Sequence, residues 1–385
     1  MQIKPEMFNR SCVTIDLKAL ANNIREIRRV TKEGAEIMAV VKADAYGHGS
    51  VRVAKVLLDN GADRLCVATV EEAIELREAD ITAPILILGF TSKYGYHKVV
   101  EYDIEQAIYC YEDALCLSQI AVKAGKKVKV HIKIDTGMGR LGFLSDAEKN
   151  YINNIEKISK LDGIEMFGVF SHFATADEGG DSDEFTRGQF EKFISIVDEL
   201  KSRGVSFAKR HICNSAGTLR FPEMHMEMVR AGLVLYGLMP PGCPKPSKEV
   251  NLIPVMSWYA KVINDKVIDE GMSVSYGRHF VADKKTRVLT ISVGYADGLS
   301  RRLGNGSFEL EIGKTRVPII GNVCMDMCMV DGTRLNVNNV EIMDEEPVLI
   351  FGQGKSADDL ANYLGTINYE ITCVVGKRVQ RIYIE

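Results

Sequence analysis

The sequence predicts an α/β fold, a (β/α)8 barrel of the TIM type followed by a C-terminal mostly-β domain. Short apolar runs alternate with amphipathic segments through the first part of the chain, as in a barrel of parallel strands. The stretch 240–246 holds four of the ten prolines, which marks a domain edge. Beyond it, β-rich runs follow one another without long helices. We therefore place the barrel at residues 1–245 and the β domain at residues 246–385.

Eight strand-type runs support the barrel. They lie at residues 36–41, 64–68, 85–88, 105–109, 128–134, 164–170, 207–212 and 232–236. Eight repeats of strand and helix favour a closed barrel, although the same periodicity also fits an open doubly wound sheet. A further strand at residues 11–17 is open to pairing with the C-terminal domain instead.

The helices are predicted from helical spacing and from caps. Asp16 is a candidate N-cap for the first helix, Thr69 and Glu72 form a capping-box pattern, and Gly204 stands where a C-terminal cap belongs. Apolar side chains recur on one helical face after Asp16 and again before Gly204. The two sets are Leu17, Leu20, Ile24 and Ile27, and Phe190, Phe193, Ile194, Val197 and Leu200.

The β domain is predicted from six runs without long helices between them. They lie at residues 255–263, 287–293, 308–312, 317–320, 325–330 and 347–351. One late helix is expected to start near Ser356.

The composition indicates a soluble globular protein, and its charge balance neither favours nor excludes a small-molecule substrate. Hydrophobic residues make up 46% and charged residues 26%, and the net charge is −4, which argues against non-specific nucleic-acid binding. No apolar run approaches the ~20 residues that span a bilayer, and residues 1–10 lack the apolar core of a signal peptide. We expect a cytoplasmic location, with no nucleic-acid or membrane partner.

Nine cysteines are scattered along the chain without the pairs of a metal site. Cys324 and Cys328 are four residues apart, but no second pair or suitably spaced histidines follow. We expect reduced, mostly buried thiols and no metal.

The most specific motif is the string from Ala39 to Gly49, in which Lys42 ends an apolar strand. In a barrel this position lies at the carboxyl end of the strand, where such enzymes build their sites. A partly desolvated amine there suits a covalent bond to an aldehyde. Gly47 and Gly49 let the backbone turn sharply afterwards. Taken alone, a strand-end lysine is more often a solvated or ion-paired surface residue.

The full string closely resembles the cofactor-lysine signature of alanine racemases, which are pyridoxal-phosphate enzymes with a barrel and a β domain. The resemblance continues in the family's order along nearly the whole chain. Two departures are Asp44, where many members carry Asn, and Ala231, where Pro is common. The other matching segments lie at residues 131–142, 171–172, 214–215, 228–233, 274–278, 294–298, 321–326 and 366–370.

The resemblance implies racemisation of L- and D-alanine by two bases. Lys42 would hold the cofactor and serve as one base, and Tyr276 would be the other, reaching in from the second subunit of a homodimer. A proton removed from one face of a planar carbanion must return to the opposite face for inversion, so a base is needed on each side.

The resemblance also implies how pyridoxal phosphate would be held. The phosphate would meet the hydroxyls of Tyr46, Ser215 and Tyr369 and the backbone N–H groups of Gly232 and Leu233. His172 would pack on the ring, and Asn214 would help to fix the cofactor. Arg230 would donate a hydrogen bond to the ring nitrogen, because an arginine does not give up its proton.

The implied substrate contacts involve both domains. Arg140 and the backbone N–H of Met325, from the partner chain, would meet the substrate carboxylate. Tyr295 and Tyr369 would form a gate that leaves room for a methyl side chain. Lys133 would be carbamylated, and the anion would orient Arg140; an ordinary strand lysine paired with a carboxylate is the alternative. His48 and His131 are interpreted as structural.

Three other functions stay open at this point. A racemase of the same family acting on serine, lysine or a broader range would use the same two bases and differ at the gate. A non-catalytic pyridoxal-phosphate-binding barrel would lack the β domain. A decarboxylase of similar architecture would need a glycine-rich phosphate loop. The physiological role implied by the family is D-alanine supply for the cell-wall peptide, as a peptidoglycan precursor, or amino-acid catabolism.

Overall fold

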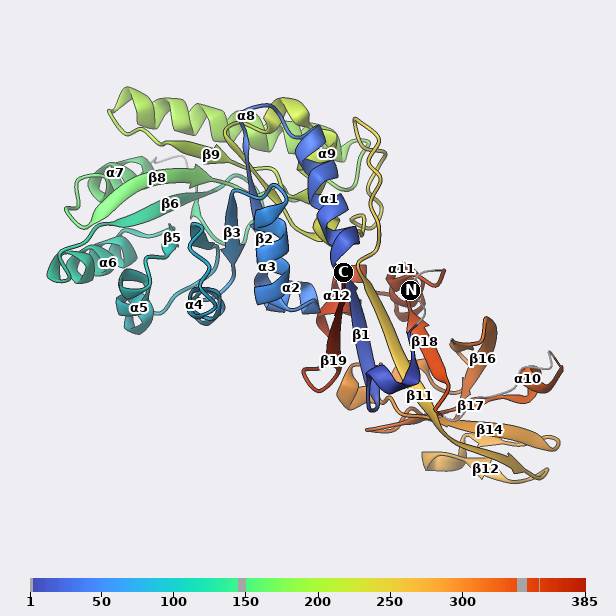
Figure 1. The fold of residues 1–385 in the computed structure, drawn as a ribbon. Helices are drawn as coiled ribbons and strands as arrows, with labels where there is room; N and C mark the ends of the chain where they lie inside the picture. The colour runs from blue at the N-terminus through green and yellow to red at the C-terminus, as the bar shows by residue number, and fades with distance from the viewer. Residues whose placement is uncertain (1–2, 145–149, 338–344, 353) are drawn as a thin grey trace. The chain divides into compact units, whose positions relative to one another are not determined.

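The computed structural model describes residues 3–144, 150–337, 345–352 and 354–385 (Figure 1). The chain folds into two compact units, each with its own sheet. One unit comprises residues 19–253, and the other comprises residues 1–18 together with residues 254–385. Within the described residues, no helix is both long enough and apolar enough to cross a membrane.

The first unit is a nearly closed barrel of parallel strands, ordered β10-β2-β3-β4-β5-β6-β8-β9 in its described part. At the two ends of this order, the Arg230 N–H on β10 donates to the Cys213 carbonyl just beyond β9 over 3.0 Å. The (β/α)8 prediction is confirmed over the open sheet. The bounds are β2 (Glu36–Val40), β3 (Arg64–Val67), β4 (Ile85–Ile87), β5 (Glu105–Ile108), β6 (Val128–Asp135), β8 (Ile164–Phe170), β9 (Lys209–His211) and β10 (Met228–Ala231), with a short β7 (Phe143–Leu144) beside β6.

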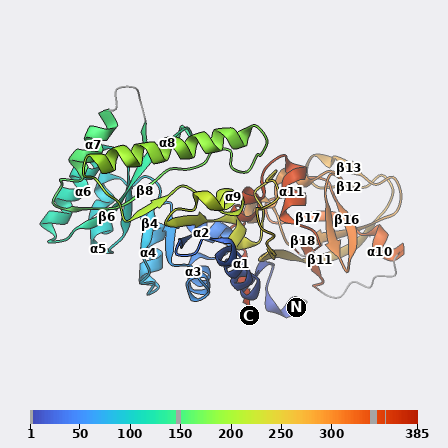
Figure 2. The same cartoon turned by 90° about the horizontal axis from the view of Figure 1, so that it is seen from above.

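Helices lie around the outside of these strands, with the long α8 running along one side (Figures 1 and 2). The predicted apolar faces are confirmed, since Leu20, Ile24 and Ile27 are fully buried on the first helix. The capping box of Thr69 and Glu72 is also present. The bounds are α1 (Leu17–Val30), α2 (Lys42–Gly47), α3 (Ser50–Asp59), α4 (Val70–Glu78), α5 (Tyr96–Glu101), α6 (Tyr111–Lys123), α7 (Asn150–Ile158), α8 (Ser182–Ser202) and α9 (Ser215–Arg220), with 3₁₀ turns η2 (Lys93–Gly95), η3 (Pro222–Met224) and η4 (Leu233–Tyr236).

The strand predicted at residues 232–236 was wrong. The eighth barrel strand is β10, and the apolar run that follows it is the buried 3₁₀ turn η4. A short apolar run does not distinguish a buried strand from a buried helical turn by periodicity. Gly232 takes φ −120° and ψ −104°, which breaks the extended backbone, and Gly237 ends the turn in the left-handed region at φ +78°.

The second unit is built on an eight-stranded sheet with the order β14-β17-β16-β15-β18-β11-β1-β19, in which β14 also pairs with β11. The strand expected at residues 11–17 is β1, which pairs antiparallel with β11 and parallel with β19. The bounds are β1 (Ser11–Asp16), β11 (Met256–Ile268), β14 (Thr286–Ile291), β15 (Glu309–Ile312), β16 (Thr315–Ile320), β17 (Cys328–Asp331), β18 (Pro347–Phe351) and β19 (Gln380–Ile384).

The strand predicted at residues 325–330 begins later, at Cys328. Met325 lies in a turn instead, because the Cys324 N–H donates to the Met327 carbonyl over 2.9 Å and the chain reverses between them. The helix expected near Ser356 is α11, with Ser356 as its N-cap. The remaining elements are the hairpin β12 (Ser273–Val274) and β13 (Phe280–Val281), the helices α10 (Thr333–Val337), α11 (Ala357–Leu364) and α12 (Asn368–Cys373), and the 3₁₀ turns η1 (Pro5–Met7), η5 (Tyr276–Arg278), η6 (Tyr295–Asp297) and η7 (Arg301–Leu303).

Candidate active site

Five of the predicted site residues occur where barrel strands end. Lys42 follows β2, Lys133 lies near the end of β6, His172 follows β8, Asn214 follows β9, and Arg230 lies on β10. Since all these strands are parallel, their carboxyl ends open on the same face of the barrel. The fold therefore gathers these five side chains at one mouth.

Lys42 begins an unusual turn that its neighbours hold in place. Residues 43–46 have φ between +52° and +53°, a left-handed conformation that is costly for residues other than glycine. Glu72 accepts the Ala43 N–H over 2.7 Å, and Asp44 accepts the Ser50 N–H over 2.7 Å. An Asn side chain has an oxygen for the same bond, so the Asp44 departure preserves it. These contacts fix the backbone on which the half-buried Lys42 stands.

Arg230 is a buried cation held by four acceptors. Its guanidinium donates to the Ser171 and Ile212 carbonyls over 2.8 and 3.0 Å, to His211 Nδ1 over 2.8 Å and to His172 Nδ1 over 3.1 Å. Burial lowers the pKa of Arg230 to about 10, so the side chain stays protonated at neutral pH. The result is a rigid, permanently charged donor in the barrel interior.

Two hydroxyls and one N–H group converge at Gly232. The Gly232 N–H donates to Ser215 Oγ over 3.0 Å. A Cβ atom at this position would lie 2.9 Å from Tyr46 Oη and 3.6 Å from Ser215 Oγ, so only glycine leaves this space open. Leu233 follows at the start of η4. Donors arranged in this way suit an anion.

Asn214 is engaged in capping α9. Its side-chain oxygen accepts the Gly217 N–H over 2.9 Å, and its amide donates to the Phe173 carbonyl over 3.5 Å. The cap fixes Ser215, the first residue of α9, in its place beside Gly232.

Lys133 is buried on β6, with Nζ 5.1 Å from the centre of the Phe170 ring. Burial, followed by the charges of Arg140, Arg230 and Lys42, lowers the pKa of Lys133 to about 7. In the described part of the chain, no carboxylate forms an ion pair with it. The alternative of an ordinary lysine paired with a carboxylate therefore finds no support.

Asp135 shapes the loop that carries Arg140, a role the sequence analysis missed. Its carboxylate accepts the N–H groups of Gly137, Gly139 and Arg140 over 2.9, 3.1 and 3.1 Å. Burial alone would raise the pKa of Asp135, but these bonds together outweigh it, lower the pKa and favour the ionised carboxylate. An aspartate at a strand end, followed by two closely spaced glycines, was the available signal. The Arg140 side chain itself is exposed.

In the second unit, Tyr276 stands exposed on a clamped turn. Its side chain is 74% exposed, while the Asn322 amide donates to its carbonyl over 2.7 Å. Ser275 has φ +68° and donates through its hydroxyl to the Asn322 carbonyl over 2.7 Å. The backbone is therefore fixed and the phenol projects from the unit.

Tyr295 and Met325 lie on two loops that are joined by backbone bonds. The Tyr295 N–H donates to the Cys324 carbonyl, and the Ala296 N–H donates to the Met325 carbonyl, each over 3.0 Å. A Cβ atom at Gly294 would lie 2.4 Å from both carbonyl oxygens, so this approach requires glycine. The two predicted residues are thus positioned together, and both are exposed.

A buried aspartate, also missed by the sequence analysis, anchors these loops. Asp297 is fully buried and accepts the Gly294 N–H over 2.9 Å. It also pairs with Arg10 over 3.3 Å and with Arg378 over 2.6 Å. Arg10 and Arg378 are distant in sequence from Asp297, so no local pattern could have revealed the cluster.

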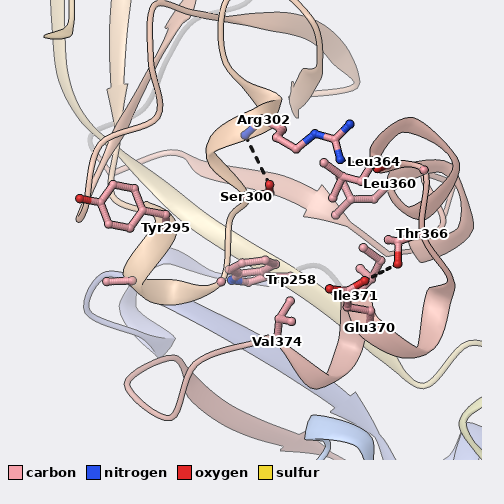
Figure 3. A pocket seen from close by; sticks show the side chains of 13 residues that line it. Trp258, Tyr295, Ser300, Arg302, Leu360, Leu364, Thr366, Glu370, Ile371 and Val374 are labelled. Carbon is pink, nitrogen blue, oxygen red and sulfur yellow. Dashed lines mark hydrogen bonds between the residues drawn. The ribbon is translucent and has the colours of Figure 1, made fainter.

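Tyr295 also borders a cavity of about 580 Å³ whose lining belongs entirely to the second unit (Figure 3). Figure 3 shows Tyr295 at the left of the view and Arg302 at the top. Tyr369, the third predicted tyrosine of this unit, is half-buried on α12, next to the cavity residue Glu370. Neither Tyr276 nor Met325 lines this cavity.

Comparisons with known proteins agree along nearly the whole chain. The family model for the alanine racemase N-terminal domain matches residues 15–240, and that for the C-terminal domain matches residues 255–383. The alanine racemase of Clostridium tetani is 45% identical over 379 residues, which cover 96% of this chain and 94% of that protein. The alanine racemase of Methanococcus maripaludis is 45% identical over 374 residues, covering 96% and 97%.

Solved structures show the same similarity. The alanine racemase of Clostridium difficile 630 superposes with a TM-score of 0.90 at 36% identity, covering 98% of this chain and 96% of that chain. The alanine racemase of Bacillus anthracis with bound L-Ala-P gives a TM-score of 0.89 at 35% identity, with the same coverage. Fold, site and relatives together define an enzyme of the amino-acid racemase class, an isomerase. Within that class, the chain belongs to the alanine racemase family.

Proposed function

We propose that this enzyme interconverts L- and D-alanine as a homodimer, with pyridoxal 5'-phosphate as its cofactor. The observation that carries the proposal is the barrel mouth. A strand-end lysine, a buried arginine and an anion-sized cluster of donors around Gly232 occur there together. An aldehyde, a ring nitrogen and a phosphate each have a suitable partner in this set.

The residues present fit the cofactor. The hydroxyls of Tyr46 and Ser215 and the N–H groups of Gly232 and Leu233 would hold the phosphate, with the Tyr369 hydroxyl as a further partner. The space that a Cβ atom at Gly232 would fill supports this assignment. When bound, pyridoxal phosphate supplies an electron-withdrawing ring that acidifies the α C–H bond of the attached amino acid.

The ring contacts follow from the buried network. His172 accepts a hydrogen bond from Arg230 and would pack against the ring, while Asn214 keeps Ser215 in place. Arg230 would donate to the ring nitrogen. Because its pKa is near 10, it would not hand over a proton, and the nitrogen would stay unprotonated. A weaker electron sink discourages side reactions such as transamination.

Lys42 and Tyr276 would be the two bases. One would remove the α-proton at its Nζ atom or its Oη atom, and the other would return a proton to the opposite face. The 74% exposure of Tyr276 supports its reach into the site of a second copy, and hence a homodimer. The exposed Met325 and Tyr295 would come from the same partner.

Substrate selection would depend on Arg140 and the Met325 N–H for the carboxylate, and on Tyr295 and Tyr369 for the side chain. Two phenols would leave room for a methyl group. A pocket rejects an extra methylene by only ~1–3 kcal/mol, so a low rate with serine is expected beside alanine.

Lys133 would carry a carbamate. Its pKa near 7 leaves much of the amine neutral at physiological pH. The neutral nitrogen would attack the carbon of CO₂, form an N–C bond and release one proton to solvent, giving an anion. That anion would lie among the charges of Arg140, Arg230 and Lys42 and would orient Arg140.

The cellular setting would be a reducing compartment, the cytoplasm. Cys12, Cys66, Cys213 and Cys328 are buried thiols that form no disulfide, which supports this assignment. The product would supply D-alanine for the cell-wall peptide.

The test uses the purified chain with added pyridoxal phosphate. L-alanine, L-serine and L-lysine are incubated separately in deuterated water and analysed by chiral chromatography and mass spectrometry. We expect deuterated D-alanine to form fastest. Borohydride reduction should fix the cofactor to the peptide containing Lys42, and Lys42→Arg is the matched control. Retention of enantiomeric purity with all three substrates would contradict the proposal.

A further inference from the structure

A chain of hydrogen bonds crosses the barrel interior behind Arg230. The guanidinium contacts His211 Nδ1 over 2.8 Å, and His211 Nε2 contacts His131 Nδ1 over 2.9 Å. His131 Nε2 then contacts Glu105 Oε2 over 3.1 Å, and Glu105 Oε1 accepts from Arg64 over 2.5 Å. Glu105, His131 and His211 lie on β5, β6 and β9, while Arg64 and Arg230 lie on β3 and β10. From the sequence, His131 was interpreted as structural, and neither Glu105 nor His211 stands in a pattern that predicts this contact.

The direction of this chain is fixed by its ends. An arginine has only donors, so His211 Nδ1 must accept and its proton must lie on Nε2. That Nε2–H donates to His131 Nδ1, which places the second proton on His131 Nε2. A carboxylate has only acceptors, so Glu105 receives this last bond. Reversing any link would set two donors or two acceptors against each other.

Burial keeps the groups in these protonation states. His131 and His211 are fully buried, and Glu105 is 5% exposed. Burial lowers the pKa of both histidines, and the charges of Arg230 and Arg64 act in the same direction. Glu105 raises the pKa of His131, but it does not outweigh these effects. For Glu105, burial alone would raise the pKa, but His131 and Arg64 outweigh it and lower the pKa. The chain thus holds neutral imidazoles between one anion and one cation.

Two aromatic rings and one glycine pack against this chain of hydrogen bonds. The Phe170 ring stacks on His211 with centres 4.8 Å apart, and Arg64 lies 4.7 Å from the centre of the Phe167 ring. Gly168 on β8 lies directly against His131, because a Cβ atom there would be 2.2 Å from His131 Nδ1. An alanine at this position would occupy the place of the His131–His211 bond.

We propose that Glu105 is a positioning residue for Arg230, acting through His131 and His211. By accepting from His131, Glu105 fixes both imidazoles with their protons on Nε2. The lone pair of His211 Nδ1 is then always directed at the guanidinium, which keeps Arg230 in one orientation. The link to the ring nitrogen rests on the proposed function, whereas the assignment of the protons does not.

The first test reads the proton positions directly. The full-length protein, labelled with ¹⁵N-histidine, is studied by ¹⁵N NMR with and without pyridoxal phosphate, and signals are assigned with His131→Gln and His211→Gln. We expect both residues to be neutral with the proton on Nε2. A proton on Nδ1 of either residue, or a charged imidazole at neutral pH, would overturn the proposal. This result stands apart from the proposed function, because it needs no bound cofactor.

The second test reads the effect on Arg230. Glu105→Met removes the acceptor, Glu105→Gln keeps one, and Glu165→Met removes an exposed carboxylate on β8 as a control. Losing a partner that orients a site residue typically costs about 10-fold to 100-fold in activity. We expect a loss of this size in kcat for Glu105→Met, with KM within about twofold, and recovery in Glu105→Gln.

The absorption band of the bound cofactor distinguishes a positioning role of Glu105 from a purely structural one, because loss of stability alone would leave the band unchanged. For Glu105→Met we expect its pH dependence to shift, with the histidine signals showing mixed proton positions. If Glu105→Met does not fold, Gly168→Ala breaks the next bond of the chain and should give the same spectral change. Unchanged spectra and unchanged kcat in the folded variants would overturn the proposal.

Discussion

Arg378 Nε donates to Asp297 Oδ1 over 2.6 Å, and this bond joins an arginine that is 40% exposed to a carboxylate that is fully buried. The hydrogen bond that Arg378 donates to Asp297 raises the pKa of Arg378. Because Asp297 also caps the Gly294 N–H, the pair connects the chain's last strand region to the loop that carries Tyr295. The pair thereby helps to fix the two loops that carry Tyr295 and Met325, the two predicted substrate contacts.

Asp297→Asn should loosen this loop. Removing the charge leaves Arg10 and Arg378 without their shared anion, but both are partly exposed, so solvent compensates for part of the loss. We expect a fall of about 1–2 kcal/mol in the free energy of unfolding, measured with urea. The KM for alanine should rise more than kcat falls. Asp326→Asn, which removes a half-exposed partner of Arg378, is the control and should cost under ~1 kcal/mol.

Gly232→Ala should weaken cofactor binding without unfolding the barrel. The added methyl group would lie 2.9 Å from Tyr46 Oη and fill the space between the donors. We expect a clear rise in the dissociation constant for pyridoxal phosphate, measured by equilibrium dialysis. Gly188→Ala is the control, since Gly188 is exposed on α8 with open space around its Cβ position. That control should be neutral or stabilise by ~1 kcal/mol. Equal affinities in the two variants would contradict the assignment of the phosphate.

Lys133 should make stability depend on pH. Its folded pKa is about 7, against ~10.4 in an unfolded chain, so between these values the unfolded state binds more protons. Stability therefore rises with pH across that window, and Lys133→Met lacks this contribution. In CO₂-free buffer, urea unfolding should give Lys133→Met its largest gain in free energy of unfolding over the natural chain at pH 7 and below. The difference should disappear near pH 10.5. Parallel stability curves would count against a depressed pKa.

Added bicarbonate should offset this loss of stability in the natural chain, because carbamylation turns the largely neutral Lys133 amine into an anion among the cations Arg140, Arg230 and Lys42. We expect the free energy of unfolding at pH 8 to rise with bicarbonate in the natural chain and to stay unchanged in Lys133→Met. A high-resolution map with a bare ammonium at Lys133 under these conditions would exclude the carbamate.

Tyr276→Phe should separate the two bases. A lost general base typically lowers the rate by 10²–10⁴-fold, so racemisation should fall by roughly that amount. The amine on the other face remains, and one enantiomer of alanine should still exchange its α-proton with deuterated water while keeping its configuration. NMR of both enantiomers measures this. Tyr94→Phe, which changes a 79% exposed tyrosine, should behave as the natural chain. Equal exchange of both enantiomers in Tyr276→Phe would remove Tyr276 from the mechanism.

Local sequence patterns predicted those elements that are stabilised by interactions between residues close together in the sequence. The apolar face of Leu20 and Ile24 and the capping box of Thr69 lie within one or two helical turns, and the structure has them as expected. The run at residues 232–236 was misinterpreted because apolar residues alone do not separate a strand from a buried turn.

Candidate site residues could be predicted from the sequence only where they stand in a continuous motif. Lys42 stands in a string long enough to resemble a family, whereas Glu105 and His131 meet through strand register and Asp297 meets Arg10 through the sheet of the second unit. Such contacts depend on residues far apart in the chain. No spacing rule could have joined them, so they emerged from the fold alone.

Strand β1 has a consequence for how the enzyme forms during synthesis. Ser11 on β1 pairs with Ala260 on β11. Strand β1 is synthesised first, so its edges stay unpaired until the ribosome has completed the barrel and β11. Its other neighbour, β19, is made later still. An unpaired edge is prone to pair with a neighbouring chain, so we expect nascent copies that are close together on one messenger RNA to be at risk of misassembly.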